Sequence, residues 1–135
     1  MPPTATETTS LITCTLPSTP YSVQLARFYI RAALRYHDLG GYAPDAVTVA
    51  SELVTNAVTH AGPPGIGLLL MRLAGSGALA VVVADRSPHP PVLRDAPADA
   101  EHGRGLHIVA ALSARWGWRP QEPGKAVYAI LTREG

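Results

Sequence analysis

The chain has 135 residues, of which 47% are hydrophobic and 16% charged, a composition that predicts one folded domain and excludes a multidomain enzyme or a disordered regulator. Eleven basic residues against ten acidic ones give a formal net charge of +1, which excludes a broad field attracting nucleic acid or anionic lipid. The single cysteine, Cys14, excludes an intramolecular disulfide and a multi-cysteine zinc site, and it favours a reducing, cytoplasmic compartment.

The first residues are expected to lie outside the fold. Residues 1–10 are rich in Thr and Pro and lack the basic start and apolar core of a secretory signal, so we expect a disordered tail followed by a single domain over residues 11–135. Leu11–Leu16 is β-prone and followed by Pro17, which predicts a first strand. Apolar residues then recur at helical spacing from Pro20 until Gly40-Gly41, which predicts a first helix.

The clearest helical pattern covers Asp45–Ala61. Projection at roughly 100° per residue places apolar side chains on one side and polar ones on the other. The helix is expected to end at Gly62-Pro63-Pro64, because proline lacks the amide hydrogen and has a fixed φ. The apolar side comprises Ala46, Val47, Ala50, Leu53, Val54, Ala57, Val58 and Ala61.

The second half of the chain predicts two hairpins separated by a loop and a helix. Ile66–Leu73 and Ala78–Asp85 flank a glycine-containing turn, and the second of these strands is apolar enough to lie at the centre of a sheet. A proline-containing loop over 86–102, a candidate lid, leads to a third helix after Gly103-Arg104-Gly105. Trp116–Arg119 and Val127–Thr132 close the domain as a hairpin.

The predicted order is therefore β-α-α-β-β-loop-α-β-β. This order predicts an α/β two-layer sandwich, with helices grouped on one face of a mixed, mostly antiparallel sheet. The apolar stretch over 65–84 is interrupted by Arg72 and a turn, so no membrane span is expected.

Glu52 and Asn56 lie one helical turn apart on the polar side of the second helix. An Asn carbonyl together with phosphate oxygens can hold Mg²⁺, while a carboxylate one turn away can activate a nucleophile. Taken alone, such a pair on a polar helix face is more often only solvated. His60, another turn on, would by itself be a capping or packing residue.

Residues at two further positions are candidates for nucleotide binding. Asp85 ends an apolar strand, where a carboxylate can accept a hydrogen bond from an exocyclic amine such as that of adenine, although a plain turn residue is the simpler alternative. Gly103-Arg104-Gly105 precedes a helix whose free amides can face a phosphate, although glycine there can serve only to turn the chain. Gly124-Lys125 is no P-loop, because Ala126 follows and a strand comes next.

In this order the three signals resemble the motifs of the histidine-kinase-like ATPase superfamily, the Bergerat-fold group. The segment 52–60, ELVTNAVTH, is similar to its N box, 82–85, VVAD, to the strand and aspartate of its first glycine box, and 103–109, GRGLHIV, to its second. Within that superfamily the short lid looks most like the anti-sigma-factor serine/threonine kinases. The resemblance covers nearly the whole chain from Leu11 onward.

The resemblance implies a fold, a reaction and partners. ATP would be the phosphoryl donor, with Glu52 as the general base and Asn56 as the ligand of Mg²⁺. A serine of a STAS-type anti-anti-sigma protein would be phosphorylated, and a sigma factor would be the other partner. A cytoplasmic homodimer without direct nucleic-acid contact is also implied. The residues assigned to ATP are Asn56, His60, Asp85, Gly103, Arg104, Gly105 and Lys125.

One departure from the family pattern leaves an alternative open. Asp85 is followed by Arg86-Ser87-Pro88-His89, with no glycine where the first glycine box continues with one. A non-catalytic regulator that binds its partner with weak or absent ATP binding is the second hypothesis. A plain ATPase, in which Glu52 activates water, is the third.

Overall fold

The computed structural model describes residues 8–61, 65–91 and 105–133. In chain order the elements are β1 (Thr8–Leu16), α1 (Tyr21–Tyr36), the short 3-10 helix η2 (Gly40–Tyr42), α2 (Ala43–Ala61), β2 (Ile66–Leu73), β3 (Leu79–Asp85), α3 (Gly105–Leu112), β4 (Arg115–Gln121) and β5 (Gly124–Leu131). The predicted order of helices and strands is confirmed, with η2 added between the first two helices.

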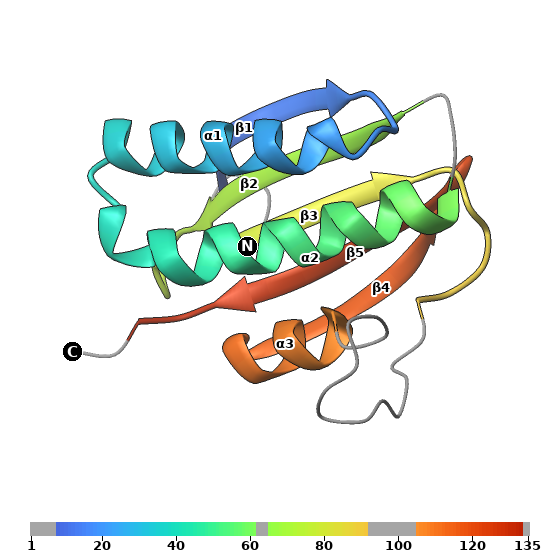
Figure 1. Ribbon diagram of the computed structural model, residues 1–135. Coiled ribbons are helices and arrows are strands. Elements are labelled where there is room, and N and C mark those ends of the chain that lie inside the picture. Colours follow the sequence, from blue (N-terminus) through green and yellow to red (C-terminus); the bar gives the residue numbers. More distant parts are fainter. Residues whose placement is uncertain (1–7, 62–64, 92–104, 134–135) are drawn as a thin grey trace.

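The strands form a five-stranded sheet in the order β1-β2-β3-β5-β4. Each of the four pairings is antiparallel, so the sheet that the structure describes has none of the parallel pairing that a mixed sheet would contain. The three α-helices lie side by side on one face of this sheet, as Figure 1 shows. The chain is thus the predicted α/β two-layer sandwich, with β3 at its centre as expected.

The first strand begins earlier than the sequence predicts. Thr8 pairs with Leu73 and Thr9 with Arg72, so residues 8–10, expected in the tail, belong to β1. Because Thr and Ser are polar, the hydrophobicity pattern does not reveal that the strand extends to these residues. The β-branched threonines are nevertheless favourable in an edge strand. Residues 1–7, the remainder of the predicted tail, lie outside the described residues.

The first helix is amphipathic and ends before the predicted glycines. Its buried positions are one turn apart: Ser22, Ala26, Ile30 and Leu34. The helix stops at Tyr36, because Asp38 takes a left-handed conformation with φ of 60°, and the Leu39 amide donates a hydrogen bond back to the Leu34 carbonyl. Gly40 and Gly41 belong instead to η2.

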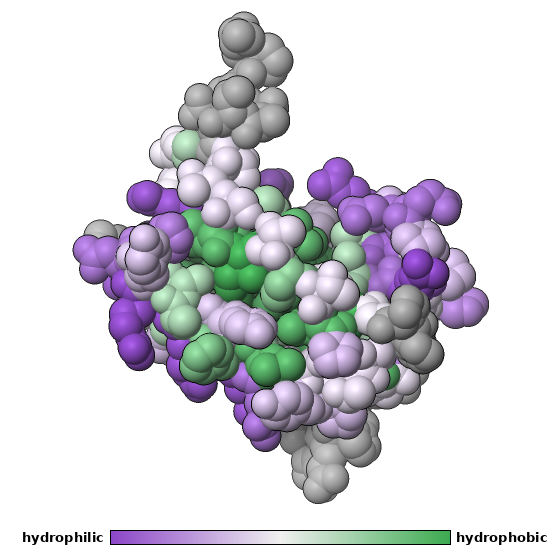
Figure 2. All heavy atoms as spheres, turned by 90° about the horizontal axis from the view of Figure 1, so that it is seen from above, coloured by the Kyte–Doolittle hydropathy of each residue, from purple (hydrophilic) through white to green (hydrophobic). Residues whose placement is uncertain are grey.

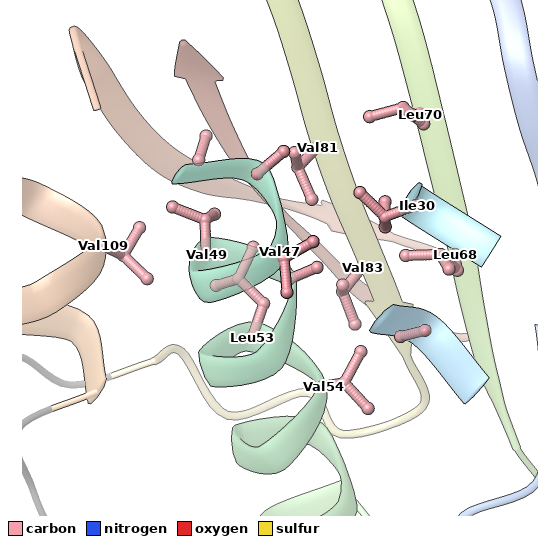
Figure 3. Packing of buried hydrophobic residues seen from close by; sticks show 14 of the residues in the cluster. Ile30, Val47, Val49, Leu53, Val54, Leu68, Leu70, Val81, Val83 and Val109 are labelled. Carbon is pink, nitrogen blue, oxygen red and sulfur yellow. The ribbon is translucent and has the colours of Figure 1, made fainter. Parts of the chain in front are cut away.

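The core lies between the helices and the sheet. Figure 3 shows the apolar side of α2 facing β3, with Val109 of α3 beside Val49 and Leu53. Val49, Val54, Val81, Val83 and Val109 are no more than 1% exposed. Because α2 is fixed by this packing on its apolar side, its polar side is held in one orientation. Among the described helices, none is long and apolar enough to span a membrane.

Candidate functional site

The polar side of α2 meets the start of α3. Glu52 and Asn56, one turn apart on α2, are both half-buried. A Cβ built on Gly105, the first residue of α3, would lie 3.6 Å from Glu52 Oε2 and 3.7 Å from Glu52 Cβ. The backbone at the start of α3 is therefore in contact range of the Glu52 side chain.

The contact between α3 and Glu52 places backbone hydrogen-bond donors next to a carboxylate that can accept a proton. The first amides of a helix have no intrahelical acceptor, and they carry the positive end of its dipole. In this chain they lie beside Glu52, a carboxylate that can accept a proton. Gly103 and Arg104, also assigned to phosphate binding, lie outside the described residues.

Asp85, at the end of β3, forms a buried ion pair. Its Oδ1 accepts a hydrogen bond from Lys125 Nζ at 3.0 Å, and the two side chains are only 4% and 6% exposed. The same oxygen accepts the Ser87 amide at 2.9 Å. Lys125 Nζ also lies 3.4 Å from the Ser87 carbonyl oxygen. Lys125 thus holds the end of β3 and the turn that follows it.

The Asp85 side chain also stabilises the turn that follows β3. Its bond to the amide two residues on closes an Asx-type turn, and the His89 amide then donates to the Ser87 hydroxyl at 3.2 Å. Ser87 itself is buried. None of the residues 86–89 has a positive φ, so this turn does not require a glycine for its backbone conformation.

The contact between Asp85 and Lys125 was not anticipated from the sequence, although both residues were assigned to ATP. It follows from the register, because the two residues are direct partners in the β3–β5 ladder. The available signal was the position of the chain's single lysine at the start of the strand that pairs with β3.

Residues 16–131 match the family model of the histidine kinase-like ATPase domain. The chain belongs to this family. Membership confirms the resemblance drawn from the three motifs and implies an ATP-binding domain. No curated protein matches the chain.

A solved structure supports the fold of this histidine kinase-like ATPase domain. The crystal structure of the RsbU and RsbW domains of Rv1364c from Mycobacterium tuberculosis is similar with a TM-score of 0.67 and 23% sequence identity. The similarity covers 92% of this chain and 33% of that one. The chain therefore spans about a third of the protein whose architecture it shares.

The surroundings of His60, one of the residues assigned to ATP, and of Cys14, the single cysteine, bear on what each side chain can do. His60 is exposed in the last turn of α2, where a basic side chain complements the negative end of the helix dipole. Cys14 packs against the core, and burial raises the pKa of its thiol, so it remains neutral at pH 7 and is no candidate nucleophile. Across residues 8–61, 65–91 and 105–133, no group of three or more His, Cys, Asp or Glu could hold a metal ion.

Gly124 is required by the close approach of β5 to the end of β3. A Cβ at this position would lie 2.2 Å from the Asp85 carbonyl oxygen and 2.5 Å from Arg86 Cα, both backbone atoms that cannot move aside cheaply. We expect Gly124→Ala to lower the free energy of unfolding by about 1–3 kcal/mol, the usual range for overpacking. Urea denaturation measures this change.

Gly40→Ala is the matched control for that substitution, because nothing lies within 4 Å of a Cβ at Gly40. This variant should unfold at nearly the same urea concentration as the wild type. Equal stabilities for the two alanine variants would contradict the close packing of Gly124 against β3.

Proposed function

We propose that this ATP-binding domain is a protein serine/threonine kinase that also acts as an anti-sigma factor. The observation that carries the proposal is the position of Glu52, one turn from Asn56 and directly beside the start of α3. A carboxylate lies beside the first turn of α3 there, with an amide side chain one helical turn away on α2, and phosphoryl transfer uses groups of these kinds.

The proposed reaction moves the γ-phosphoryl group of ATP to a serine hydroxyl of a partner protein. The serine oxygen forms a bond to the γ-phosphorus as the bond from that phosphorus to the bridging oxygen of ADP breaks. Glu52 accepts the proton that leaves the hydroxyl. The amides at the start of α3 stabilise the negative charge on the phosphate oxygens.

Asn56 would hold Mg²⁺ through its side-chain oxygen. Mg²⁺ commonly keeps several waters and takes phosphate oxygens as ligands, so a single amide oxygen of the protein can be enough to hold it. When bound, the ion supplies positive charge against the phosphates. The half-buried Asn56 lies one turn from Glu52, so both side chains project from the same side of α2.

The partners proposed are those implied by the family resemblance. The substrate would be a STAS-type anti-anti-sigma protein and the second ligand a sigma factor, bound by a cytoplasmic homodimer without direct nucleic-acid or membrane contact. The RsbW domain named in the similar structure supports this choice of pathway.

Incubation with γ-labelled ATP and Mg²⁺, with and without a purified STAS protein encoded in the same genome, tests the proposal. We expect label on a serine of the STAS protein only when both proteins are present. Release of labelled phosphate without transfer would support a plain ATPase instead. A panel of STAS proteins that all remain unlabelled would contradict the kinase assignment.

A second candidate function is a non-catalytic regulator that binds its partner with weak or absent ATP binding. The buried pair between Asp85 and Lys125 favours it, because the carboxylate expected to meet adenine is already bonded to an ammonium group. Titration calorimetry with Mg·ATP separates the two functions. Binding that is lost in both Asn56→Ala and Asp85→Ala supports the kinase, whereas no binding by the wild type supports the regulator.

A further inference from the structure

One exposed aromatic side chain lies on the sheet itself. The described residues have five exposed large hydrophobic side chains, and four of them belong to α1, on the side of the molecule that Figure 2 shows, where apolar side chains gather between hydrophilic ones. The fifth is Trp118 of β4, which is 37% exposed and lies at the opposite edge of the sheet from β1. Trp118 follows Trp116 by two residues, so both side chains point to the same face. Because Trp116 packs against the core, that face is the one that the helices cover.

The pairing of β4 with β5 agrees with this direction. The direct partner of Trp118 is Val127, whose side chain is 6% exposed and belongs to the core. The preceding pair joins Gly117 and Tyr128, and a Cβ on Gly117 would lie 2.6 Å from the Tyr128 hydroxyl oxygen. The Tyr128 side chain therefore covers β4 on the opposite face at this point. The indole of Trp118 faces the layer of α2 and α3.

This position places Trp118 next to the buried ion pair. Lys125 precedes Val127 by two residues on β5, so Lys125 is a diagonal neighbour of Trp118 on the same face. Diagonal neighbours on two antiparallel strands lie roughly 7–8 Å apart, within reach of an aromatic side chain. Asp85 is the direct partner of Lys125 on the next strand, β3. An indole and a carboxylate thus lie on either side of Lys125, toward the same end of the sheet.

The Asp85 carboxylate keeps one oxygen for a ligand. Both hydrogen bonds that it accepts from described residues, from Lys125 Nζ and from the Ser87 amide, end on Oδ1. The second oxygen, Oδ2, can therefore accept a hydrogen bond from an exocyclic amine. A nucleobase offers a polar edge of donors and acceptors and two aromatic faces, and an aromatic side chain contacts a face. Asp85 is suited to the edge of a base, and Trp118 is suited to its face.

We propose that Trp118 is a nucleotide-binding residue, and that the base of the nucleotide stacks on its indole. The inference deepens the proposed function, because it rests on nucleotide binding by this domain and adds a residue to that site. Stacking needs an aromatic face that is open to solvent and a backbone that holds it in place. Trp118 meets both conditions, since it is exposed and β4 pairs with β5 along its whole length. Because every base has an aromatic face, the indole contributes affinity, and selectivity among bases is left to Asp85.

Titration calorimetry with Mg·ADP measures the contribution of the indole to affinity. Trp118→Ala should raise the Kd about 5–150-fold, the range of one stacking contact between a base and an aromatic side chain. Trp118→Phe keeps an aromatic ring and should recover most of that loss. Arg119→Ala, at the next position of β4 and on its opposite face, is the matched control and should bind like the wild type. Mg·tripolyphosphate has no base, so the wild type and Trp118→Ala should bind it equally.

Intrinsic fluorescence gives a second readout, which does not depend on enzymatic activity. The chain has two tryptophans, Trp116 and Trp118. Addition of Mg·ADP should quench the emission of the wild type, because the base would contact the indole of Trp118 directly. Trp118→Phe retains only Trp116, which packs against the core, so its emission should not respond to Mg·ADP.

The outcomes separate this inference from the proposed kinase function. Equal affinities of the wild type and Trp118→Ala for Mg·ADP would overturn the inference and leave the kinase assay unaffected. Equal weakening of Mg·ADP and Mg·tripolyphosphate binding in Trp118→Ala would also overturn it, because the indole would then act on the whole site and not on the base. Failure of the wild type to bind Mg·ADP would overturn both proposals. The expected loss in Trp118→Ala without transfer to any STAS protein would support the inference and contradict only the kinase. Unchanged circular dichroism shows that each variant is folded.

Discussion

Replacing Glu52 with glutamine is expected to lower the rate of phosphoryl transfer by about 10²–10⁴-fold, the range that a general base contributes. Glutamine has nearly the same shape but does not accept the hydroxyl proton. Asn56 and the amides of α3 remain in place, so the affinity for Mg·ATP should change little. The transfer rate is measured with labelled ATP and a STAS protein, and the affinity by titration calorimetry.

Asp45→Asn provides the matched control for that loss. Asp45 is an exposed carboxylate in the first turn of the same helix, away from the start of α3. Its replacement removes one negative charge from α2 but should leave the transfer rate near that of the wild type. Transfer by Glu52→Gln at the wild-type rate would show that another group takes the proton.

The second large effect is expected on stability. Lys125→Met should lower the free energy of unfolding by about 3–5 kcal/mol, because removal of one partner leaves the other charge buried without compensation. Asp85 would keep only the Ser87 amide as a donor among the described contacts. Since domains of this kind are stable by only about 5–15 kcal/mol, urea denaturation should show a large shift of the midpoint.

The double variant Asp85→Asn with Lys125→Met should regain much of that stability. It removes both charges, while the asparagine oxygen can still accept the Ser87 amide, and an uncharged replacement of a buried pair is often nearly neutral. Arg119→Met, which removes an exposed cation from β4, is the control and should change stability little. If Lys125→Met were as stable as this control, the pair of Asp85 and Lys125 would contribute almost nothing to the free energy of unfolding.

The sequence predicted the elements best where one periodicity extends over many residues. The end of α2 at Ala61 follows the prediction, and its apolar stripe lies in the core, because a long amphipathic repeat has only one way to bury its apolar side. The central place of β3 followed from its continuous apolar run. The same projection placed Glu52 on the polar side of α2, whereas its contact with the start of α3 could be read only from the structure.

Features that depend on tertiary contacts could not be predicted from the sequence. Thr8 and Thr9 join β1 only because β2 lies beside them, and their own sequence carries no alternating pattern. The helix boundary at Tyr36 depends on the left-handed Asp38, a conformation that glycine signals better. The bond between Asp85 and Lys125 depends on strand register across the sheet, which spacing along the chain does not reveal.

The neighbouring positions of β3 and β5 also govern how the chain tolerates changes in length. Both strands belong to local hairpins, and their mutual pairing closes a long stretch that includes the segment 86–104 before α3. The entropy of closing a flexible loop rises only with the logarithm of its length, so doubling such a segment costs about 0.6 kcal/mol. Insertions between β3 and α3 should therefore leave the pairing of β3 with β5 intact.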